Sequence, residues 1–213
     1  MELFTAKDFK VFDIPGFHDR MEAIAERVRP KLEGIGRELL PTLSGLVDQE
    51  LFVHVAKHQR RTVNPPNDTW AAIGAGKRGY KKDVHFKIAV SRHCVRLLFE
   101  VGPEYYDKTE WALKWRRDIK TIVEAVGSNK KLGWFKDEHN EEPEALLKSW
   151  TPAQLKALGH EITRRRDGQL VIGCRIDQAD MVQMKPAAFK RFAQRTFKPV
   201  AGLFSLHDQR VLV

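Results

Sequence analysis

The feature that most constrains the fold is a stripe of apolar residues between positions 17 and 46. Successive members lie three or four residues apart, which is the spacing of one face of an α-helix. The stripe consists of Phe17, Met21, Ile24, Val28, Leu32, Ile35, Leu39, Leu43 and Leu46. Pro30 and Pro41 interrupt it, and because proline donates no backbone hydrogen bond and clashes with the preceding turn, we expect a kinked helix or two nearly coaxial helices. Since the stripe continues through both prolines, we expect a single surface, a sheet, to receive the whole element.

The next part of the chain has the two-residue period of β-strands. Short β-rich runs at residues 51–57 and 69–75 precede a stronger pair at residues 85–91 and 93–101. The stronger pair is predicted to form a hairpin whose apolar residues share one face. These residues are Phe86, Ile88, Val90, Val95, Leu97 and Phe99.

The opposite face of this predicted hairpin carries charge. With a two-residue loop at residues 91–92, Lys87 lies opposite Arg96. Like charges directly across a strand pair are unfavourable. We therefore expect a local partner such as Glu100, solvent exposure, or a bound anion between them.

Caps and periodicity predict the remaining elements. They are a short helix over 6–12 opened by Thr5 and Asp8, a helix over 107–126, a polar connection with an acidic edge over 127–150, a helix opened by Thr151, a strand over 169–177 and a helix from Pro186 onward. This order of helices and strands predicts an α+β fold. We expect a single domain over residues 1–213, with a mainly antiparallel β-sheet covered by the long kinked N-terminal helix and by C-terminal helices.

Positive charge is concentrated in one part of the chain. The whole sequence carries 37 Lys and Arg against 28 Asp and Glu, a net charge of +9, and residues 51–100 alone hold 10 basic and 3 acidic side chains, a net +7. Such an excess favours anionic partners, although solvated Lys and Arg on an ordinary surface produce the same composition.

The sequence also sets a class of protein aside. No apolar run approaches the roughly 20 residues of a membrane span, and the N-terminus lacks the basic segment and apolar core of a signal peptide. We expect a cytoplasmic protein with no membrane segment, in which Cys94 and Cys174 are reduced, buried thiols.

The composition of residues 57–82 is unusual for a segment with a purely structural role. This segment contains the run RRTVNPPNDTW at residues 60–70, followed by KRGYKKDVHF at residues 77–86. The adjacent prolines, Pro65 and Pro66, lock their φ angles and donate no backbone hydrogen bond, so they predict a stiff connection. A stiff connection holds the side chains around it in a fixed relation, which lowers the entropic cost of binding.

The side chains of this segment suit a negatively charged ligand. Arginine supplies a planar fork of donors for phosphate or carboxylate, asparagine supplies donor and acceptor, and Trp70 and Tyr80 offer faces for a stacked base. The predicted ligand-binding residues are Arg60, Arg61, Asn64, Asn67, Asp68, Trp70, Lys77, Arg78, Tyr80, Lys81 and His85. The alternative is structural: a proline-fixed turn in which Arg60 or Arg61 pairs with Asp68 while Trp70 lies in the core.

The same segment carries a resemblance to a known family. The runs RRTVNPPNDTW and KRGYKKDVHF, with FDIPGF at residues 12–17, resemble the YktB-like family of uncharacterised bacterial proteins. The resemblance extends over essentially the whole chain and implies a compact α+β domain in a cytoplasmic setting. It supplies no reaction, so the matching residues are motif positions without an assigned role. These are Arg60, Arg61, Asn64, Pro65, Pro66, Asn67, Asp68, Trp70, Lys77, Arg78, Gly79, Tyr80, Lys81 and His85.

Sharper enzyme motifs fail in this sequence. A Walker phosphate-binding loop requires glycine where Ala71 stands and serine or threonine where Arg78 stands. His54 and His58 have the spacing of shared metal ligands on one helical face, yet no third ligand follows at a recognisable distance. We therefore expect no metal site and no cofactor.

Three functions remain open. The first is a binding module whose basic segment, joined by residues 164–166, binds a phosphate-bearing ligand, either nucleic acid or a nucleotide. The second is an enzyme acting on a small anionic substrate, with Arg60 and Arg61 as clamps and Asp68 or a histidine as general acid or base. The third is a domain that docks on an acidic protein. We favour the binding module, and whether the chain catalyses a reaction stays open.

Overall fold

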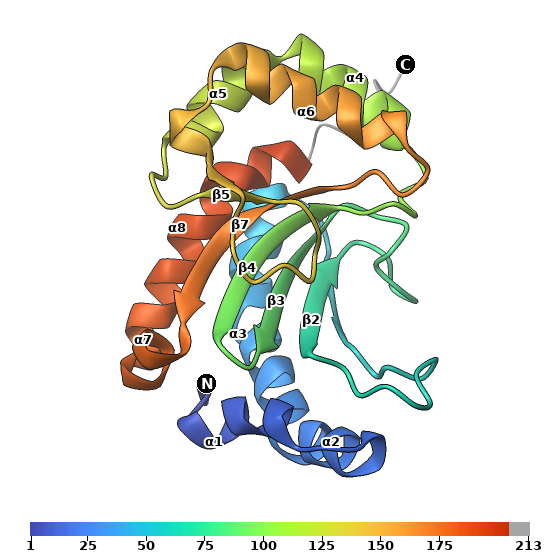
Figure 1. Cartoon of the computed structure of the whole chain (residues 1–213). Coiled ribbons are helices and arrows are strands. Elements are labelled where there is room, and N and C mark those ends of the chain that lie inside the picture. Colours follow the sequence, from blue (N-terminus) through green and yellow to red (C-terminus); the bar gives the residue numbers. More distant parts are fainter. Residues whose placement is uncertain (205–213) are drawn as a thin grey trace.

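Seven strands form one sheet in the computed structural model, which describes residues 1–204 (Figure 1). Residues 205–213, the end of the predicted domain, lie outside the described part. In spatial order the strands are β1 (Phe52–Val55), β2 (Asp68–Gly74), β3 (His85–Ser91), β4 (Cys94–Val101), β7 (Leu170–Asp177), β5 (Gly133–Phe135) and β6 (Ala145–Leu146). All neighbouring strands pair antiparallel, so the predicted α+β class with a mainly antiparallel sheet is confirmed.

The helices gather on and around this sheet. They are α1 (Ala6–Phe9), η1 (Lys10–Asp13), α2 (Phe17–Ala23), η2 (Ile24–Val28), α3 (Arg29–Val47), α4 (Lys108–Arg117), α5 (Ile119–Gly127), η3 (Leu147–Ser149), α6 (Pro152–Arg164), α7 (Gln178–Gln183) and α8 (Pro186–Phe204). α3 and α8 lie against one face of the sheet, behind the strands in Figure 1, while α4, α5 and α6 form a layer above it. Within residues 1–204, none of these helices combines the length and apolar character that crossing a bilayer requires.

The apolar stripe of residues 17–46 forms the predicted long helical run. α2 passes into the π-helical turn η2 and then into α3, so the helical backbone continues from Phe17 to Val47. The wider turn directly precedes Pro30, which has no N–H to donate to the preceding turn, and π-helical turns absorb defects of this kind. Pro41 lies inside α3 without ending it.

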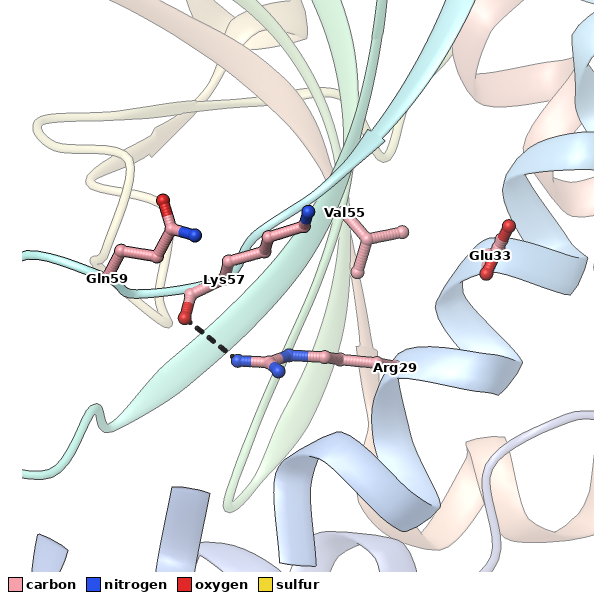
Figure 2. Close-up of a pocket in the computed structure, with 5 residues that line it drawn as sticks. All are labelled: Arg29, Glu33, Val55, Lys57 and Gln59. Atoms are coloured by element: carbon pink, nitrogen blue, oxygen red, sulfur yellow. Dashed lines mark hydrogen bonds between the residues drawn. The ribbon is translucent and has the colours of Figure 1, made fainter. Parts of the chain in front are cut away.

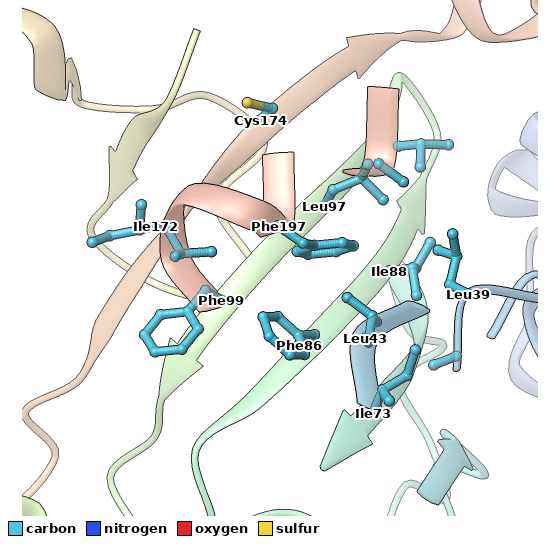
Figure 3. Packing of buried hydrophobic residues seen from close by; sticks show 14 of the residues in the cluster. Leu39, Leu43, Ile73, Phe86, Ile88, Leu97, Phe99, Ile172, Cys174 and Phe197 are labelled. Carbon is cyan, nitrogen blue, oxygen red and sulfur yellow. The ribbon is translucent and has the colours of Figure 1, made fainter. Parts of the chain in front are cut away.

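The hydrophobic core fills the space between the sheet and the helices α3 and α8 (Figure 3). Alternate strand residues face it, including the six apolar residues predicted to share one face of the hairpin, all of them buried. Cys94 and Cys174 are buried free thiols, and burial raises the pKa of each. α3 approaches β1 so closely that a Cβ atom on Gly36 would lie 2.7 Å from Val53 Cγ1, so the close packing requires glycine at this point of the helix.

The register predicted for the hairpin of β3 and β4 is wrong by two residues. Lys87 lies opposite Leu98 rather than Arg96, because the two-residue turn lies one residue later than expected, at residues 92–93 between the end of β3 and the start of β4. The apolar residues still share one face, since an even shift does not exchange the faces of a strand. The partner expected for Lys87 is confirmed, because Glu100 Oε1 lies 3.2 Å from its Nζ.

Two predictions further along the chain need correction. The helix expected over 107–126 is divided into α4 and α5 at Asp118. The stretch over 127–150, expected to be a polar connection, contains β5 and the edge strand β6, which are too short to show a two-residue period. Residues 136–144, which we call the strap, join these two strands and cross in front of the sheet in Figure 1, on the side away from α3 and α8.

Candidate functional site

The face of the sheet opposite the core carries a floor of buried charge. Alternation along β2, β3 and β4 places five titratable side chains on this face: Asp68, His85, Lys87, Arg96 and Glu100. Lys87 and Arg96 have no exposed surface, and the other three residues are at most 5% exposed. Charges remain inside a protein only when they are paired, so their ionic partners define the site.

Glu100 is the centre of one half of this floor. Its Oε1 lies 3.2 Å from Lys87 Nζ, and its Oε2 lies 3.0 Å from His85 Nε2. Burial favours the neutral acid, but Lys87 and His85 overcome it and lower the pKa of Glu100 to about 2. Lys87 also pairs with Glu138 of the strap, and these two carboxylates raise the pKa of the lysine despite its burial. Glu100 and Lys87 therefore stay charged at neutral pH, and the pair between Lys87 and Glu138 ties the strap to the floor.

Asp68 organises the other half of the floor. Its Oδ2 accepts a 2.6 Å hydrogen bond from Arg96 Nη2, and both of its oxygens lie 3.1 Å from Nδ1 of His139 on the strap. Arg96 Nη1 also donates to the carbonyl oxygens of Glu138 and Asn140, which flank His139 in the chain. One buried guanidinium therefore fixes both the carboxylate and the backbone that presents the imidazole.

An aromatic pair adjoins the floor. Trp70 Nε1 donates a 2.7 Å hydrogen bond to the Tyr80 hydroxyl, which orients both rings. The Lys87 ammonium lies 4.4 Å from the centre of the Trp70 ring. The rings of His58 and His139 contact the same indole, at centroid separations of 5.2 and 5.7 Å. Trp70 is therefore half-buried in a polar cluster, so its predicted alternative place in the core is wrong.

A hollow of about 890 Å³, which we call the basic hollow, opens beside this pair and is lined by both rings. Its charged lining residues are Lys57, Arg60, Arg61, Arg78, Lys81, Lys82, Asp83 and Glu104. Of its two carboxylates, Glu104 pairs with Lys81 at 3.3 Å. Within residues 1–204, Arg60, Arg61 and Arg78 form no ion pair with a carboxylate. The excess of unpaired guanidinium groups makes the potential of the hollow positive.

Six of the predicted ligand-binding residues meet at the basic hollow. They are Arg60, Arg61, Trp70, Arg78, Tyr80 and Lys81. Asn67 and Asp68 line an adjoining hollow of about 560 Å³, which also contains His139 and shares Arg61 with the basic hollow. The diproline segment thus presents its side chains to two neighbouring hollows.

The other predicted residues lie elsewhere. His85 is buried and bonded to Glu100, so it belongs to the floor. Asn64 and Lys77 are exposed and do not line the basic hollow. Residues 164–166 also lie outside it, and two of the three arginines there pair with neighbouring carboxylates.

Two arginines of the N-terminal helices hold the basic segment in place. Arg20 Nη1 donates to the carbonyl oxygen of Pro66 at 3.2 Å, which anchors the diproline corner to α2. Arg29 Nη2 donates to the carbonyl oxygen of Lys57 at 2.9 Å (Figure 2). This second contact borders a further hollow of about 380 Å³ lined by Arg29, Glu33 and Lys57, and Lys57 also lines the basic hollow. Burial lowers the pKa of Arg29.

The sequence did not identify Glu138 and His139 as part of the site. Asp68 pairs with Arg96 and His139, so the predicted alternative in which Arg60 or Arg61 pairs with Asp68 is wrong. The sequence feature that could have indicated this contact is complementary charge. The run DEHNEE at residues 137–142 is acidic, whereas residues 51–100 carry a net +7 from 10 basic and 3 acidic side chains. Complementary charge indicates attraction between the two segments but not which residues pair.

Comparison with known proteins gives matches over the full chain. Residues 4–204 match the family model DUF1054, described as a domain of unknown function. The chain is 34% identical over 211 residues to a UPF0637 protein of Bacillus licheniformis, covering 99% of this chain and 98% of the relative. It is 34% identical over 204 residues to a UPF0637 protein of Bacillus velezensis, covering 95% of each. A UPF0637 protein of Oceanobacillus iheyensis is 56% identical over 90 residues, 42% of this chain and 44% of that protein.

Proposed function

Because the chain belongs to the DUF1054 family, whose description gives no activity, we propose its function from the geometry: it binds a phosphate-bearing ligand, a nucleic acid or a nucleotide, in the basic hollow. The observation that carries this proposal is the set of arginines that have no carboxylate partner among residues 1–204, beside a hydrogen-bonded aromatic pair. Phosphate oxygens accept the forked donors of arginine, and aromatic rings stack on bases without regard to sequence.

The buried floor is not the anion-binding element. Lys87 and Arg96 already have carboxylate partners, so a ligand phosphate would have to displace Glu138 or Asp68 to reach them. The exposed side chains that line the basic hollow, which we call its rim, include Arg60 and Arg78. These groups remain available to bind a phosphate. Binding through exposed cations is strongly salt-dependent, because each neutralised phosphate releases a condensed counterion.

The test is fluorescence polarisation of a labelled single-stranded oligonucleotide at low salt with EDTA present. Arg60→Ala or Arg78→Ala should weaken binding. Each should also make the negative slope of the logarithm of the binding constant against the logarithm of the salt concentration shallower, by about 0.7 for each phosphate that the variant no longer neutralises. Arg191→Ala is the matched control, because Arg191 is an exposed arginine of α8 on the other face of the sheet. It should change neither the affinity nor the slope.

Two outcomes would contradict the proposal. One is no binding to oligonucleotides or nucleotides at low salt. The other is equal competition by polyglutamate of the same total charge, which would favour an acidic protein as the partner. Effects of the same size for Arg60→Ala and Arg191→Ala would assign any binding to net charge rather than to the basic hollow.

A further inference from the structure

Two imidazoles with different surroundings pack against the ring of Trp70. His58 belongs to the segment that lines the basic hollow, and His139 belongs to the strap. Their ring centroids lie 5.2 and 5.7 Å from that of the indole. Phosphate binding by the rim arginines uses neither histidine, so their arrangement needs a separate explanation.

Asp68 fixes the orientation and tautomer of His139. A carboxylate only accepts hydrogen bonds, so Nδ1 carries the proton that points at the two Asp68 oxygens, each 3.1 Å away. Nε2 is left for a ligand: within residues 1–204 it makes no hydrogen bond, and Glu138 Oε1 lies 3.9 Å from it. The side chain is 44% exposed. The hydrogen bond that His139 donates to Asp68 raises the pKa of His139, with Glu138 adding to the rise while burial and Lys87 oppose it. A second proton, on Nε2, is therefore favoured.

The surroundings of His58 favour the opposite protonation state. Burial is the main cause that lowers the pKa of His58 to about 4. The charged and titratable groups that act on it are Asp68, which opposes this shift, and Arg61, Arg29 and His139, which add to it. His58 is therefore neutral at pH 7.

The backbone of His58 is also unusual. Its φ of 52° lies in the left-handed region, which costs energy for a residue with a Cβ atom. Its Nε2 lies 3.0 Å from Thr69 Oγ1, which holds the ring in place. Strain of this kind persists only where the surroundings impose it, and it clusters at functional sites.

Arg61 connects the two histidines. His58 lines the basic hollow, His139 lines the adjoining hollow of about 560 Å³, and Arg61 lines both. A phosphate bound by Arg61 at the junction would have the imidazole of lowered pKa toward one hollow and the imidazole of raised pKa toward the other. Paired titratable groups whose surroundings shift their pKa values in opposite directions are the arrangement that general acid and base catalysis needs.

We propose that the chain cleaves single-stranded RNA at the junction of the two hollows, with His58 as the general base and His139 as the general acid. His58 takes the proton from a ribose 2′-hydroxyl, and the 2′ oxygen attacks the adjacent phosphorus. The bond from phosphorus to the 5′ oxygen breaks, and His139 Nε2 gives its proton to that oxygen. The products are a 2′,3′-cyclic phosphate and a free 5′-hydroxyl. One proton leaves the substrate and one enters it, so no further reactant is required, and solvent restores the two histidines.

RNA fits this arrangement better than the other phosphate ligands. Its phosphodiester carries an internal nucleophile and a leaving group that needs a proton, so one base and one acid suffice. DNA lacks the nucleophile, and a nucleotide monoester would require a bound water that no described group is seen to orient. This inference rests on the proposed function, because cleavage requires that the basic hollow first bind the strand.

The experiment compares three labelled oligonucleotides of one sequence: all RNA, all DNA, and DNA with a single ribonucleotide. Each is incubated with the full chain and EDTA from pH 4 to pH 9, and products are separated and tested for a cyclic phosphate end. We expect cleavage of RNA and of the single-ribonucleotide strand only, next to the ribose, with a bell-shaped pH profile. His58→Ala and His139→Ala should each lower the rate about 10²-fold or more, the usual effect of losing a general acid or base.

Controls separate this inference from the proposed function and from loss of folding. His160→Ala, an exposed histidine of α6, is purified in the same way and should keep the wild-type rate. Both active-site variants should still bind the all-DNA strand, with a loss of affinity far smaller than the loss of cleavage rate, and His139→Gln provides a second variant if His139→Ala fails to fold. RNA that binds but stays intact overturns the inference and leaves the proposed function standing, whereas absence of binding to every strand overturns both. Cleavage that persists unchanged in the His58 and His139 variants also overturns the inference, because it would come from a contaminant.

Discussion

Arg96 donates a 2.6 Å hydrogen bond to Asp68 at a place where the arginine has no exposed surface and the aspartate is 5% exposed. The same guanidinium holds the backbone carbonyls on both sides of His139. The strap is thus attached to the sheet by a buried charge that also orients the imidazole. The position of His139 therefore depends on Arg96, although Arg96 itself lies beneath the surface.

Replacing Arg96 by methionine leaves the Asp68 carboxylate buried, and of its two ion-pair partners within residues 1–204 His139 alone remains. Breaking one side of a buried ion pair costs about 3–5 kcal/mol, so we expect Arg96→Met to lower the free energy of unfolding by that amount in urea denaturation. Arg37→Met is the control, because the Arg37 pair with Glu33 is exposed and such pairs contribute about 1 kcal/mol or less. Similar small decreases in both variants would show that the Asp68 pair is solvated.

Because Glu100 is ionised in the folded chain, the free energy of unfolding depends on pH in the acid range. Its pKa is lowered from an ordinary 4.5 to about 2 in the folded chain, so the ionised form stabilises the fold above about 4.5 and this contribution is lost as the pH falls toward 2. Glu100→Gln should be much less stable than wild type at pH 6, and the difference should shrink between pH 4.5 and pH 2.5. A difference that stays constant over this range, measured by chemical denaturation, would contradict the assignment.

The hydrogen bond between Trp70 and Tyr80 can be measured by a double-mutant cycle. Tyr80→Phe removes the oxygen that accepts from Trp70 Nε1 at 2.7 Å, and Trp70→Phe removes the donor. An intramolecular hydrogen bond contributes about 1 kcal/mol, so the two changes should couple by about 0.5–1.5 kcal/mol in the free energy of unfolding. Additive effects would mean that the two groups bond to water instead.

Gly36 and Gly34 of α3 should respond in opposite ways to alanine. At Gly36 a Cβ atom would lie 2.7 Å from Val53 Cγ1, whereas at Gly34 no heavy atom lies within 4 Å of the added Cβ. Gly34→Ala should raise stability by roughly 0.5–1 kcal/mol through helix propensity. Gly36→Ala should lower it, because overpacking costs about 1–3 kcal/mol. Thermal denaturation of the two variants gives the comparison, and equal gains would refute the close contact between α3 and β1.

Local patterns were sufficient for most of the elements. The stripe of residues 17–46, the strands at 85–91 and 170–177 and the helix opened by Thr151 all follow from periodicity or from a cap that acts within a few residues. The hairpin register was wrong because the two-residue turn lies at residues 92–93 rather than 91–92, and a two-residue period does not encode the position of a turn. The strands β5 and β6 were missed because two or three residues carry no period.

The amino-acid sequence by itself determined the α+β class, the apolar faces and the basic, proline-stiffened segment, because each depends on residues close together in the chain. Only the tertiary structure decided that Asp68 binds His139, 71 residues away, and that Lys87 binds Glu138, 51 residues away. Ionic attraction is long-ranged and not selective along a sequence, so any of several arginines suited Asp68 equally well. Asp68 pairs with Arg96 and His139 because the sheet buries Arg96 beside Asp68 and the strap crosses both residues.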